Sequence, residues 1–448
     1  MAENMTERRF AIFTLGCKVN QEESAAIANV FCEHGWQEVP FGEAAEVTVV
    51  NTCTVTQVAE KKSRNMLRRA RAANPRTFVV ATGCYAQLKP EEAAALGLDL
   101  VLGANEKHRL YELSAAGAEK KRLNAYQPEI AVMPARDVRD YREIGNRHSR
   151  TSRTRAFVKI EDGCNQFCSY CIVPYVRGPV RSRPLSAVLA EIAGLVRDGY
   201  REVVLTGIHV GAYGTDWGEH DAFARLVEQA AAVPGLARLR LGSVEPYEVS
   251  DRLLELAAAS SVICPHFHVP LQAASSKVLQ LMGRMYDLAF YEELLVKIRA
   301  LLPEAAVTTD IIAGFPGETD VIFADELLAV RRMAFADAHI FPYSRRPGTP
   351  AAMFAGQVPN VEKNRRAEEI SHVVAETRRE FRERFIGREI EFLPEREQKK
   401  DGVSGLCGYT ANYLPVFAPE LDAAYGEICR VCVTGLTADG ELLVTGLE

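Results

Sequence analysis

The chain lacks any apolar run long enough to cross a membrane. No stretch of its 448 residues approaches the roughly 18 apolar residues of a spanning helix. Its first ten residues carry charges of both signs and no apolar signal-peptide core, so a cytoplasmic protein is expected. Glycine and proline are not in excess, which excludes fibrous and disordered classes. At roughly 150 residues per domain, the length predicts about three globular domains.

The chain also lacks the excess of positive charge that usually accompanies nucleic-acid binding. Its 53 Lys and Arg against 59 Asp and Glu leave a net charge of -6. Residues 387–448 hold five Lys or Arg and eleven Asp or Glu, so this end accounts for all of the negative charge. The rest of the chain is neutral overall, and RNA binding through arginine-rich faces remains possible there.

Paired cysteines of the export type are missing as well. The count is eleven, an odd number, and there is no export signal, so metal or redox chemistry is expected in place of a disulfide framework. We expect Cys32, Cys264 and Cys407 to be small buried residues. Cys429 and Cys432 form a CxxC string inside a predicted strand, where residues three apart face opposite sides, so no metal site is expected.

Three β-rich apolar segments near the start each end in a cysteine, at Cys17, Cys53 and Cys84. Helical stretches at about 22–33 and 55–73 separate them, and this alternation predicts a parallel sheet with helices on its faces. The carboxyl ends of parallel strands share one edge, where ligands bind. We therefore expect the three thiols to converge, and three unrelated buried cysteines are the alternative.

A second α/β series begins near residue 156 and contains six strand candidates, each followed by helical sequence. The candidates are Ala156–Ile160, Glu202–Leu205, Leu236–Leu241, Pro265–Val269, Ala306–Ile312 and Ala338–Phe341. Helices are expected at 185–198 and 291–302. Six such units predict a TIM-like barrel left incomplete, with the site in the loops after its strands.

The segments on either side of this series have a different character. Residues 117–155 lose the strand–helix regularity and carry seven arginines against three acids from Arg136 onward, which indicates a linker. A charged helix is expected at about 361–385. Short strands with glycine-rich turns follow from residue 387 and predict a small all-β barrel.

Three cysteines within eight residues, Cys164, Cys168 and Cys171, follow the first strand of the second series. Three thiolates on one tight loop can enclose a soft metal centre. Structural zinc usually takes four protein ligands, and this loop contains no fourth Cys or His. A cubic iron–sulfur cluster on three cysteines would keep one iron open for a small molecule. Free or zinc-binding thiols are the alternative.

The CxxxCxxC pattern, with an aromatic residue before its last cysteine, resembles the radical S-adenosylmethionine (SAM) superfamily. Cys17, Cys53 and Cys84 ahead of it and a small β-barrel behind it resemble the methylthiotransferases over essentially the whole chain. The supporting strings are Gly16-Cys-Lys-Val-Asn20, Val173-Pro-Tyr-Val-Arg-Gly178, His268-Val-Pro-Leu-Gln272, Thr309-Asp-Ile-Ile-Ala-Gly-Phe-Pro-Gly317 and Pro342-Tyr-Ser-Arg-Arg-Pro-Gly348.

The resemblance implies an α/β architecture of three parts. These are a Rossmann-like parallel α/β amino-terminal domain, a partial (β/α)6 TIM-like radical SAM barrel and a small all-β carboxyl-terminal TRAM barrel. The corresponding residues are 1–135, a basic linker at 136–155, 156–360, a connecting helix at 361–386, and 387–448.

The resemblance also implies two [4Fe-4S] clusters and SAM as cofactors. The open iron of the Cys164, Cys168 and Cys171 cluster would chelate SAM, and an electron from a donor such as flavodoxin or ferredoxin would cleave it to a 5′-deoxyadenosyl radical. A second cluster on Cys17, Cys53 and Cys84 would carry methylated sulfur. Two SAM molecules would be consumed, and the sulfur donor is not identified by the sequence.

Polar or glycine positions after the barrel strands are the expected SAM contacts. They are Gly207, Ser243, Glu245, Gln272, Asp310 and Gly314. A structural role such as helix capping is the alternative for each. Where the family usually reads Gln-Ser-Gly-Ser, this chain reads Gln272-Ala-Ala-Ser275, which questions any polar contact at the two alanines.

The family modifies isopentenyl-adenosine in tRNA, N6-threonylcarbamoyladenosine in tRNA, or an aspartate of a ribosomal protein. The strings Thr14-Leu-Gly-Cys-Lys-Val-Asn-Gln-Glu-Glu-Ser24 and Gly408-Tyr-Thr-Ala-Asn-Tyr413 resemble the threonylcarbamoyladenosine branch. The implied reaction is 2-methylthiolation of that nucleoside at position 37, beside the anticodon. The other two substrates and a non-catalytic RNA-binding iron–sulfur protein are the alternatives.

Basic side chains are the expected tRNA contacts. One set shares a helix face beside the auxiliary cluster and would contact phosphate, or else form a solvated face; its members are Lys61, Arg64, Arg68 and Arg71. A second set, Arg147, Arg150, Arg153 and Arg155, precedes the barrel and suits either RNA binding or solubility. Arg345 and Arg346 follow the sixth strand and would meet the anticodon loop or the threonyl carboxylate through a bidentate pair.

Overall fold

The computed structural model describes residues 8–145, 154–400 and 402–447. The chain divides into two compact units, each described by itself below. The first unit consists of Met1–Thr151, Glu161–Arg183 and Ser344–Thr349, and the second contains the remainder. The CxxxCxxC loop and the Arg345-Arg346 pair therefore belong to the same unit as the amino-terminal cysteines.

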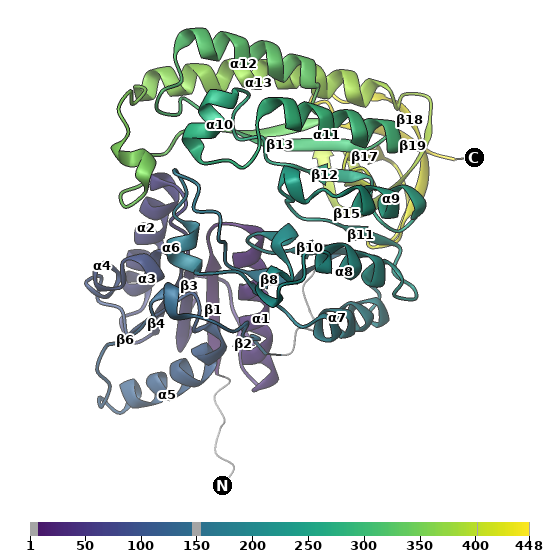
Figure 1. The fold of residues 1–448 in the computed structure, drawn as a ribbon. Coiled ribbons are helices and arrows are strands. Elements are labelled where there is room, and N and C mark those ends of the chain that lie inside the picture. The colour runs from purple at the N-terminus through teal and green to yellow at the C-terminus, as the bar shows by residue number, and fades with distance from the viewer. Residues whose placement is uncertain (1–7, 146–153, 401, 448) are drawn as a thin grey trace. The chain divides into compact units, whose positions relative to one another are not determined.

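The first unit is built on a six-stranded sheet in the order β2-β1-β3-β4-β5-β6, and all its pairings are parallel (Figure 1). The strands are β1 (Arg9–Thr14), β2 (Gln37–Glu38), β3 (Val47–Thr52), β4 (Phe78–Gly83), β5 (Leu100–Leu102) and β6 (Glu129–Ala131). The helices are α1 (Lys18–Glu33), α2 (Gln57–Ala73), α3 (Cys84–Leu88), α4 (Pro90–Ala94) and α5 (Leu110–Arg122). The parallel sheet expected from the sequence is confirmed.

Apolar side chains of the central strands build a core on each face of this sheet, because successive side chains of a strand point to opposite sides. Val47 and Val49 of β3 pack with Phe31 of α1 and Leu110 of α5. On the other face, Val50 packs against side chains of α2 and α3, among them Leu67, Ala70 and Tyr85. Burial on both faces explains why β3 and β4 are entirely buried.

The segment Glu161–Arg183 also belongs to the first unit. The strands β8 (Glu161–Asp162) and β9 (Arg181–Ser182) form an antiparallel pair, with α6 (Val173–Arg177) between them. Gly163 has φ +94°, and a Cβ there would lie 1.9 Å from the carbonyl oxygen of Pro179, so only glycine fits this crossing. The cysteine loop is thereby closed at its base.

The second unit contains six parallel strands in two hydrogen-bonded sheets, β11-β10-β7 and β12-β13-β14. Parallel bridges at Leu239–Ile263 and Ser243–His268 join them, so the incomplete barrel expected from the sequence is confirmed. The strands are β7 (Arg155–Lys159), β10 (Glu202–Thr206), β11 (Arg238–Arg240), β12 (His266–His268), β13 (Ala306–Ala313) and β14 (Asp337–Pro342). The helices are α7 (Leu185–Arg197), α8 (Ala222–Ala231), α9 (Asp251–Ala259), α10 (Ser276–Met282), α11 (Leu288–Leu301) and α12 (Asp320–Met333).

The long helix α13 (Asn360–Glu383) leads to a closed five-stranded barrel in the order β15-β16-β17-β19-β18 (Figure 1). Its strands are β15 (Glu389–Lys400), β16 (Val403–Thr410), β17 (Pro415–Pro419), β18 (Cys429–Leu436) and β19 (Leu442–Gly446). Phe381 and Phe385 at the end of α13 join the core of this barrel, which contains Phe392, Val416 and Val431. The small all-β barrel is confirmed.

Two local expectations were wrong. The segment 117–155 is more regular than expected, because α5 runs to Arg122 and β6 adds a sixth strand. Cys32 is exposed near the end of α1, whereas Cys264 and Cys407 are buried as expected.

Among the described residues, no helix is long and apolar enough to span a bilayer.

Candidate active site

Cys17, Cys53 and Cys84 lie at one edge of the first sheet, each just past a strand. Cys17 is the residue before α1, Cys53 follows β3, and Cys84 begins α3. The strand register pairs Thr14 with Asn51 and Thr52 with Gly83, which brings the three strand ends level. The convergence expected from the sequence is what the fold produces.

Two glycines allow the strand ends to approach this closely. A Cβ on Gly16, which has φ +105°, would lie 3.1 Å from the Sγ of Cys53. A Cβ on Gly83, which has φ +89°, would lie 2.5 Å from the carbonyl oxygen of Thr52. Any larger residue at either position would push one cysteine away from the next.

The thiols lie close enough to influence one another's ionisation. Burial and the nearby thiols of Cys84 and Cys17 raise the pKa of Cys53 to about 11, although Arg177 opposes the rise. Burial also raises the pKa of Cys84, against the positive charges of Arg177 and Lys107. Thiolates this close repel one another, so a positively charged iron–sulfur core would stabilise them together.

The donor set is suitable for an iron–sulfur cluster, because thiolates are the usual ligands of such clusters. A cubane spreads its thiolates farther apart than one ion does, because each sulfur binds a different iron. Three converging soft donors with buried positive charge beside them are suitable for such a cluster.

The CxxxCxxC loop is a second compact set of thiols in the same unit. The backbone N–H of Cys171 donates to the carbonyl of Cys168 over 2.9 Å, and that of Cys164 donates to Gly178 over 3.0 Å. The N–H of Val173, the first residue of α6, lies 3.4 Å from the Sγ of Cys171. These bonds fold the loop back on itself and hold its three cysteines on one short turn of chain.

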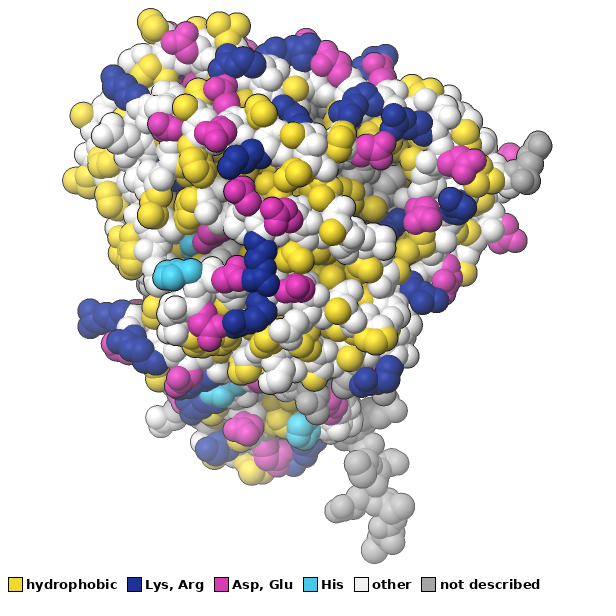
Figure 2. All heavy atoms as spheres, turned by 45° about the vertical axis from the view of Figure 1, so that its right-hand side comes forward, with side chains coloured by type: hydrophobic (Ala, Val, Ile, Leu, Met, Phe, Trp, Pro, Cys, Tyr) yellow, Lys and Arg dark blue, Asp and Glu magenta, His cyan; other side chains and the backbone are white. Residues whose placement is uncertain are grey.

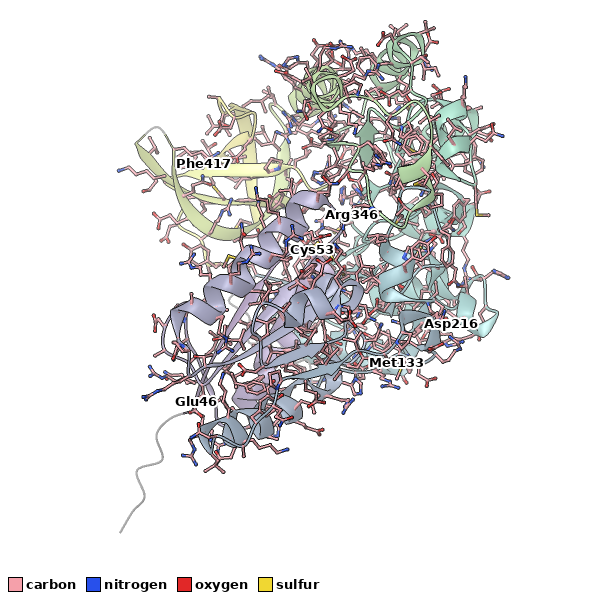
Figure 3. The ribbon with its side chains drawn as sticks, turned by 90° about the vertical axis from the view of Figure 1, so that its left-hand side faces the viewer. Glu46, Cys53, Met133, Asp216, Arg346 and Phe417 are labelled. Carbon is pink, nitrogen blue, oxygen red and sulfur yellow. The ribbon has the colours of Figure 1, made fainter. Side chains whose placement is uncertain are left out.

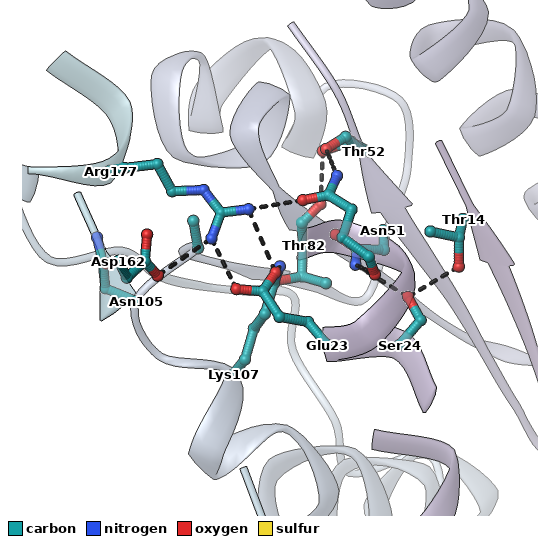
Figure 4. A network of polar contacts seen from close by, with 12 residues as sticks. Thr14, Glu23, Ser24, Asn51, Thr52, Thr82, Asn105, Lys107, Asp162 and Arg177 are labelled. Carbon is teal, nitrogen blue, oxygen red and sulfur yellow. Dashed lines mark hydrogen bonds and ion pairs between the residues drawn. The ribbon is translucent and has the colours of Figure 1, made fainter. Parts of the chain in front are cut away.

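A buried charge network, which the sequence did not reveal, joins α1, which begins after Cys17, to α6, which follows the CxxxCxxC loop. Arg177, the last residue of α6, is 0% exposed. Its Nη1 donates to Glu23 over 2.7 Å and its Nη2 to Asn20 over 2.6 Å. Lys107 also pairs with Glu23, and Asp162 lies 3.2 Å from Arg177 Nη1 (Figure 4). The Val173-Pro-Tyr-Val-Arg-Gly178 string marks this arginine, but its burial depends on distant partners.

The expected SAM contacts all lie in the second unit. Gly207, Ser243, Glu245, Gln272 and Gly314 follow the carboxyl ends of β10 to β13, whereas Asp310 lies inside β13. Gln272 has φ +67°, an uncommon conformation that persists where the surroundings fix it and that is frequent at ligand sites. Its N–H donates to Asp310, and its carbonyl accepts from Ile312.

Several of these side chains also have structural partners. Glu245 pairs with Arg284 and caps a short helical turn, while its burial raises its pKa. Asp310 lies 3.3 Å from the Nε2 of His268, and the N–H of Gly314 donates to Glu318 over 3.0 Å. Ala273 and Ala274, where this chain departs from the family pattern, are both buried. Five of the six residues thus follow strand ends, and Asp310 is the exception within β13.

The basic face of α2 divides into two kinds of side chain. Lys61 and Arg68 are exposed. Arg64 pairs with Glu60 over 2.7 Å, and Arg71 pairs with Asp99.

On the face of the molecule drawn in Figure 2, Lys and Arg side chains stand among Asp and Glu side chains. Arg147, Arg150 and Arg153 lie outside the described residues.

Arg345 and Arg346 differ sharply in exposure. Arg346 is buried, pairs with Glu60 and donates to Thr54 over 2.8 Å, one residue from Cys53 (Figure 3). Arg345 is exposed, and its carbonyl accepts from Gln57 of α2 over 3.0 Å. Arg346 is thus engaged within the protein, and Arg155 lies over the rings of Tyr409 and Tyr413 in the second unit.

Comparison with known proteins gives the family. Residues 9–103 match the family described as "Uncharacterized protein family UPF0004", and residues 158–327 match the Radical SAM superfamily. The threonylcarbamoyladenosine tRNA methylthiotransferase MtaB of Bacillus subtilis is 38% identical over 423 residues, 94% of this chain and 92% of its own. The protein of the same name from Thermotoga maritima is 37% identical over 430 residues, 96% of this chain and 95% of its own.

A relative whose name gives a different tRNA substrate matches almost as well. The tRNA-2-methylthio-N(6)-dimethylallyladenosine synthase of Pelotomaculum thermopropionicum is 36% identical over 436 residues, 96% of this chain and 95% of its own. Among solved structures, the radical S-adenosylmethionine methyltransferase TsrM from Kitasatospora setae matches with a TM-score of 0.57 at 16% identity, covering 78% of this chain and 77% of that one. This structural likeness shows the fold alone. The chain belongs to the radical SAM methylthiotransferases that modify tRNA, in the branch of the MtaB relatives.

Proposed function

We propose that the protein transfers a methylthio group to C2 of N6-threonylcarbamoyladenosine at position 37 of tRNA. The observation that carries the proposal is the convergence of Cys17, Cys53 and Cys84 at one sheet edge, in the same unit as the CxxxCxxC loop. A methylthiotransferase needs two sites for clusters, and these six cysteines supply one trio for each.

Two [4Fe-4S] clusters and two SAM molecules would, when bound, supply the hydrogen-abstracting radical, the sulfur and the methyl group. The C2–H bond would break with its hydrogen leaving on the cleaved nucleoside, and the C2–S bond would form as the methylthio sulfur leaves the auxiliary cluster, which would take up the remaining electron. The first electron comes from a donor of the flavodoxin or ferredoxin class. Cys164, Cys168 and Cys171 would hold the cluster that binds SAM, and Cys17, Cys53 and Cys84 the cluster that provides sulfur.

The remaining site residues would hold and orient the small molecules. Gly207 and Gly314 allow close backbone approach, while Ser243, Glu245, Gln272 and Asp310 offer polar groups to SAM. This division follows the proposed domains, with residues 1–135 for the auxiliary cluster, 156–360 for radical chemistry and 387–448 as a TRAM barrel. The net negative charge of that barrel means that it would recognise tRNA by shape and a few aligned groups.

The choice of substrate rests on two supports. Gly16-Cys-Lys-Val-Asn20 resembles the threonylcarbamoyladenosine branch, and the B. subtilis and T. maritima relatives carry that substrate in their names. Arg345 would pair with the threonyl carboxylate, which isopentenyl-adenosine lacks. Lys61 and Arg68, exposed on α2, would contact phosphates of the anticodon stem-loop.

Mass spectrometry of nucleosides from tRNA of cells lacking the protein tests this proposal. We expect 2-methylthio-N6-threonylcarbamoyladenosine to disappear and its unmethylthiolated precursor to accumulate. Complementation with a Cys53→Ala variant should not restore the product, whereas a Cys432→Ala variant should restore it. Persistence of the product, with loss of the methylthiolated isopentenyl nucleoside instead, would show the other tRNA substrate.

A further inference from the structure

Arg177 is a buried arginine with one donor still available beside a proposed cluster ligand. Its two Nη atoms are engaged by Glu23, Asn20 and Asp162. Its Nε–H is fully buried and has no hydrogen-bond partner. An unpaired buried N–H of a charged group is costly, so an acceptor is expected at this position.

A sulfur of the cluster that Cys84 would hold is the available acceptor. Burial raises the pKa of the Cys84 thiol, and the positive charge of Arg177 opposes that rise. Cys84 also packs against Ile172 and Val176, so side chains at α6 cover it. The sequence places Arg177 in a string that follows the CxxxCxxC motif, and in the structure its side chain pairs with Glu23 and Asn20 of α1, the helix that begins after Cys17.

The network places buried positive charge beside Cys84. Arg177 and Lys107 both oppose the rise that burial causes in the pKa of this thiol, and they share the carboxylate of Glu23. A cubane on three thiolates carries a net negative charge in its oxidised form and a larger one when reduced. Nearby buried cations therefore stabilise the reduced form more than the oxidised form.

We propose that Arg177 is a positioning residue for the auxiliary cluster, donating its Nε–H to a sulfur of that cluster and thereby raising its reduction potential. This inference rests on the proposed function, because it takes Cys17, Cys53 and Cys84 as cluster ligands. It adds an electrostatic role in the auxiliary site for a residue on the chain segment that follows the radical motif.

The test measures the auxiliary cluster alone, in full-length protein in which Cys164, Cys168 and Cys171 are replaced by alanine. After anaerobic reconstitution with iron and sulfide, the midpoint potential is determined by redox titration followed by electron paramagnetic resonance. Arg177→Gln removes one buried cation and the Nε donor, while Glu23 keeps Lys107 and Asp162 keeps Arg181 as partners. We expect a shift to more negative potential in this variant.

The matched control is Arg240→Gln, which removes an equally buried arginine of the second unit and should leave the cluster potential equal to that of the parent. Arg177→Lys keeps the charge but lacks the Nε donor, so its potential should fall between those of the parent and Arg177→Gln. Arg177→Lys carries the same measurement if Arg177→Gln does not load iron. A potential unchanged in the Arg177 variants would overturn the inference. A parent that binds no cluster would instead remove the ligand assignment of the proposed function.

Discussion

Arg240 on β11 and Glu202 on β10 form a buried ion pair, with the Nε of the arginine 2.8 Å from the Oε1 of the glutamate. The same guanidinium lies 4.7 Å from the centre of the Tyr413 ring and donates to the carbonyls of Thr410 and Ala411. One arginine thus joins two barrel strands to the carboxyl-terminal barrel.

Arg240→Met should destabilise the second unit strongly, because it leaves the Glu202 carboxylate buried without its closest cation. Breaking such a pair from one side costs about 3–5 kcal/mol. Thermal unfolding should show a lower transition temperature. The exposed Arg331–Glu380 pair provides the control, since Arg331→Met removes a solvent-screened contact and should change the transition temperature little. Equal effects of the two changes would contradict the anchoring role of Arg240.

Gly83→Ala should reduce loading of the auxiliary cluster. The new Cβ would stand 2.5 Å from the Thr52 carbonyl, and relief of that clash would displace Cys84. The measurement is iron and sulfide per chain after anaerobic reconstitution. Gly97→Ala is the matched control, because Gly97 has φ +76° but nothing within 4 Å of the added atom. If both variants load iron as the parent does, the close approach at Gly83 is not required for the cluster.

Glu60 should make stability pH-dependent at acidic pH. Burial alone raises its pKa, but hydrogen bonds from Arg346, Thr54 and Lys89 outweigh burial and lower the pKa to about 2 from 4.5. A depressed carboxyl pKa contributes stability above pH 4.5 that is lost as pH falls from 4.5 toward 2.

Denaturant unfolding at several pH values measures this contribution. Between pH 4.5 and 3, the free energy of unfolding of the parent should fall more steeply than that of Glu60→Gln. Glu112→Gln, an exposed change on α5, should retain the slope of the parent. Parallel curves for parent and Glu60→Gln would exclude the contribution.

Lys61→Gln with Arg68→Gln should weaken tRNA binding and reduce its dependence on salt. Each lost phosphate contact should lower the slope of log affinity against log salt by about 0.7–0.9. Fluorescence anisotropy with labelled tRNA, over a range of salt concentrations, measures the slope. Lys120→Gln with Arg122→Gln removes one Lys and one Arg from α5 and should leave it unchanged. A similar loss in both double variants would indicate bulk charge rather than a binding face.

Arg345→Gln should lower kcat/KM for threonylcarbamoylated tRNA roughly tenfold to a hundredfold, the value of a charge-assisted hydrogen bond. Arg345→Lys should recover part of the loss because it keeps the charge without the planar fork. Turnover is measured as methylthiolated nucleoside by mass spectrometry. Kinetics equal to the parent in both variants would remove Arg345 from the site.

Local patterns were sufficient to predict the sheet edge and the six barrel strands. Strand periodicity and a cysteine after each of three strands place Cys17, Cys53 and Cys84 at one edge, because parallel strands impose it. Some strand boundaries differ from the predicted ones by one or two residues, as where β7 begins at Arg155 rather than Ala156. These differences do not alter that edge.

Features that depend on distant partners could not be predicted. Helical spacing put Arg71 on one face with Lys61, but Asp99 engages it from the loop before β5. Burial of Arg346 depends on Glu60, which lies 286 residues earlier. The three-residue strand β6 is too short for its periodicity to be recognised, so its segment resembled a linker.

The discontinuity of the first unit affects the order in which the protein can be completed during synthesis. The sheet residues emerge from the ribosome first, yet the arginine that pairs with Glu23 follows 154 residues later. The Ser344–Thr349 segment, which brings Arg346 to Glu60, emerges later still. Since domains generally fold as units during translation, a nascent chain shorter than 177 residues contains Glu23 without Arg177, and one shorter than 346 residues contains Glu60 without Arg346. The auxiliary site is therefore completed late in synthesis. Before that point there is a long interval in which iron can be delivered while the sheet edge is still incomplete.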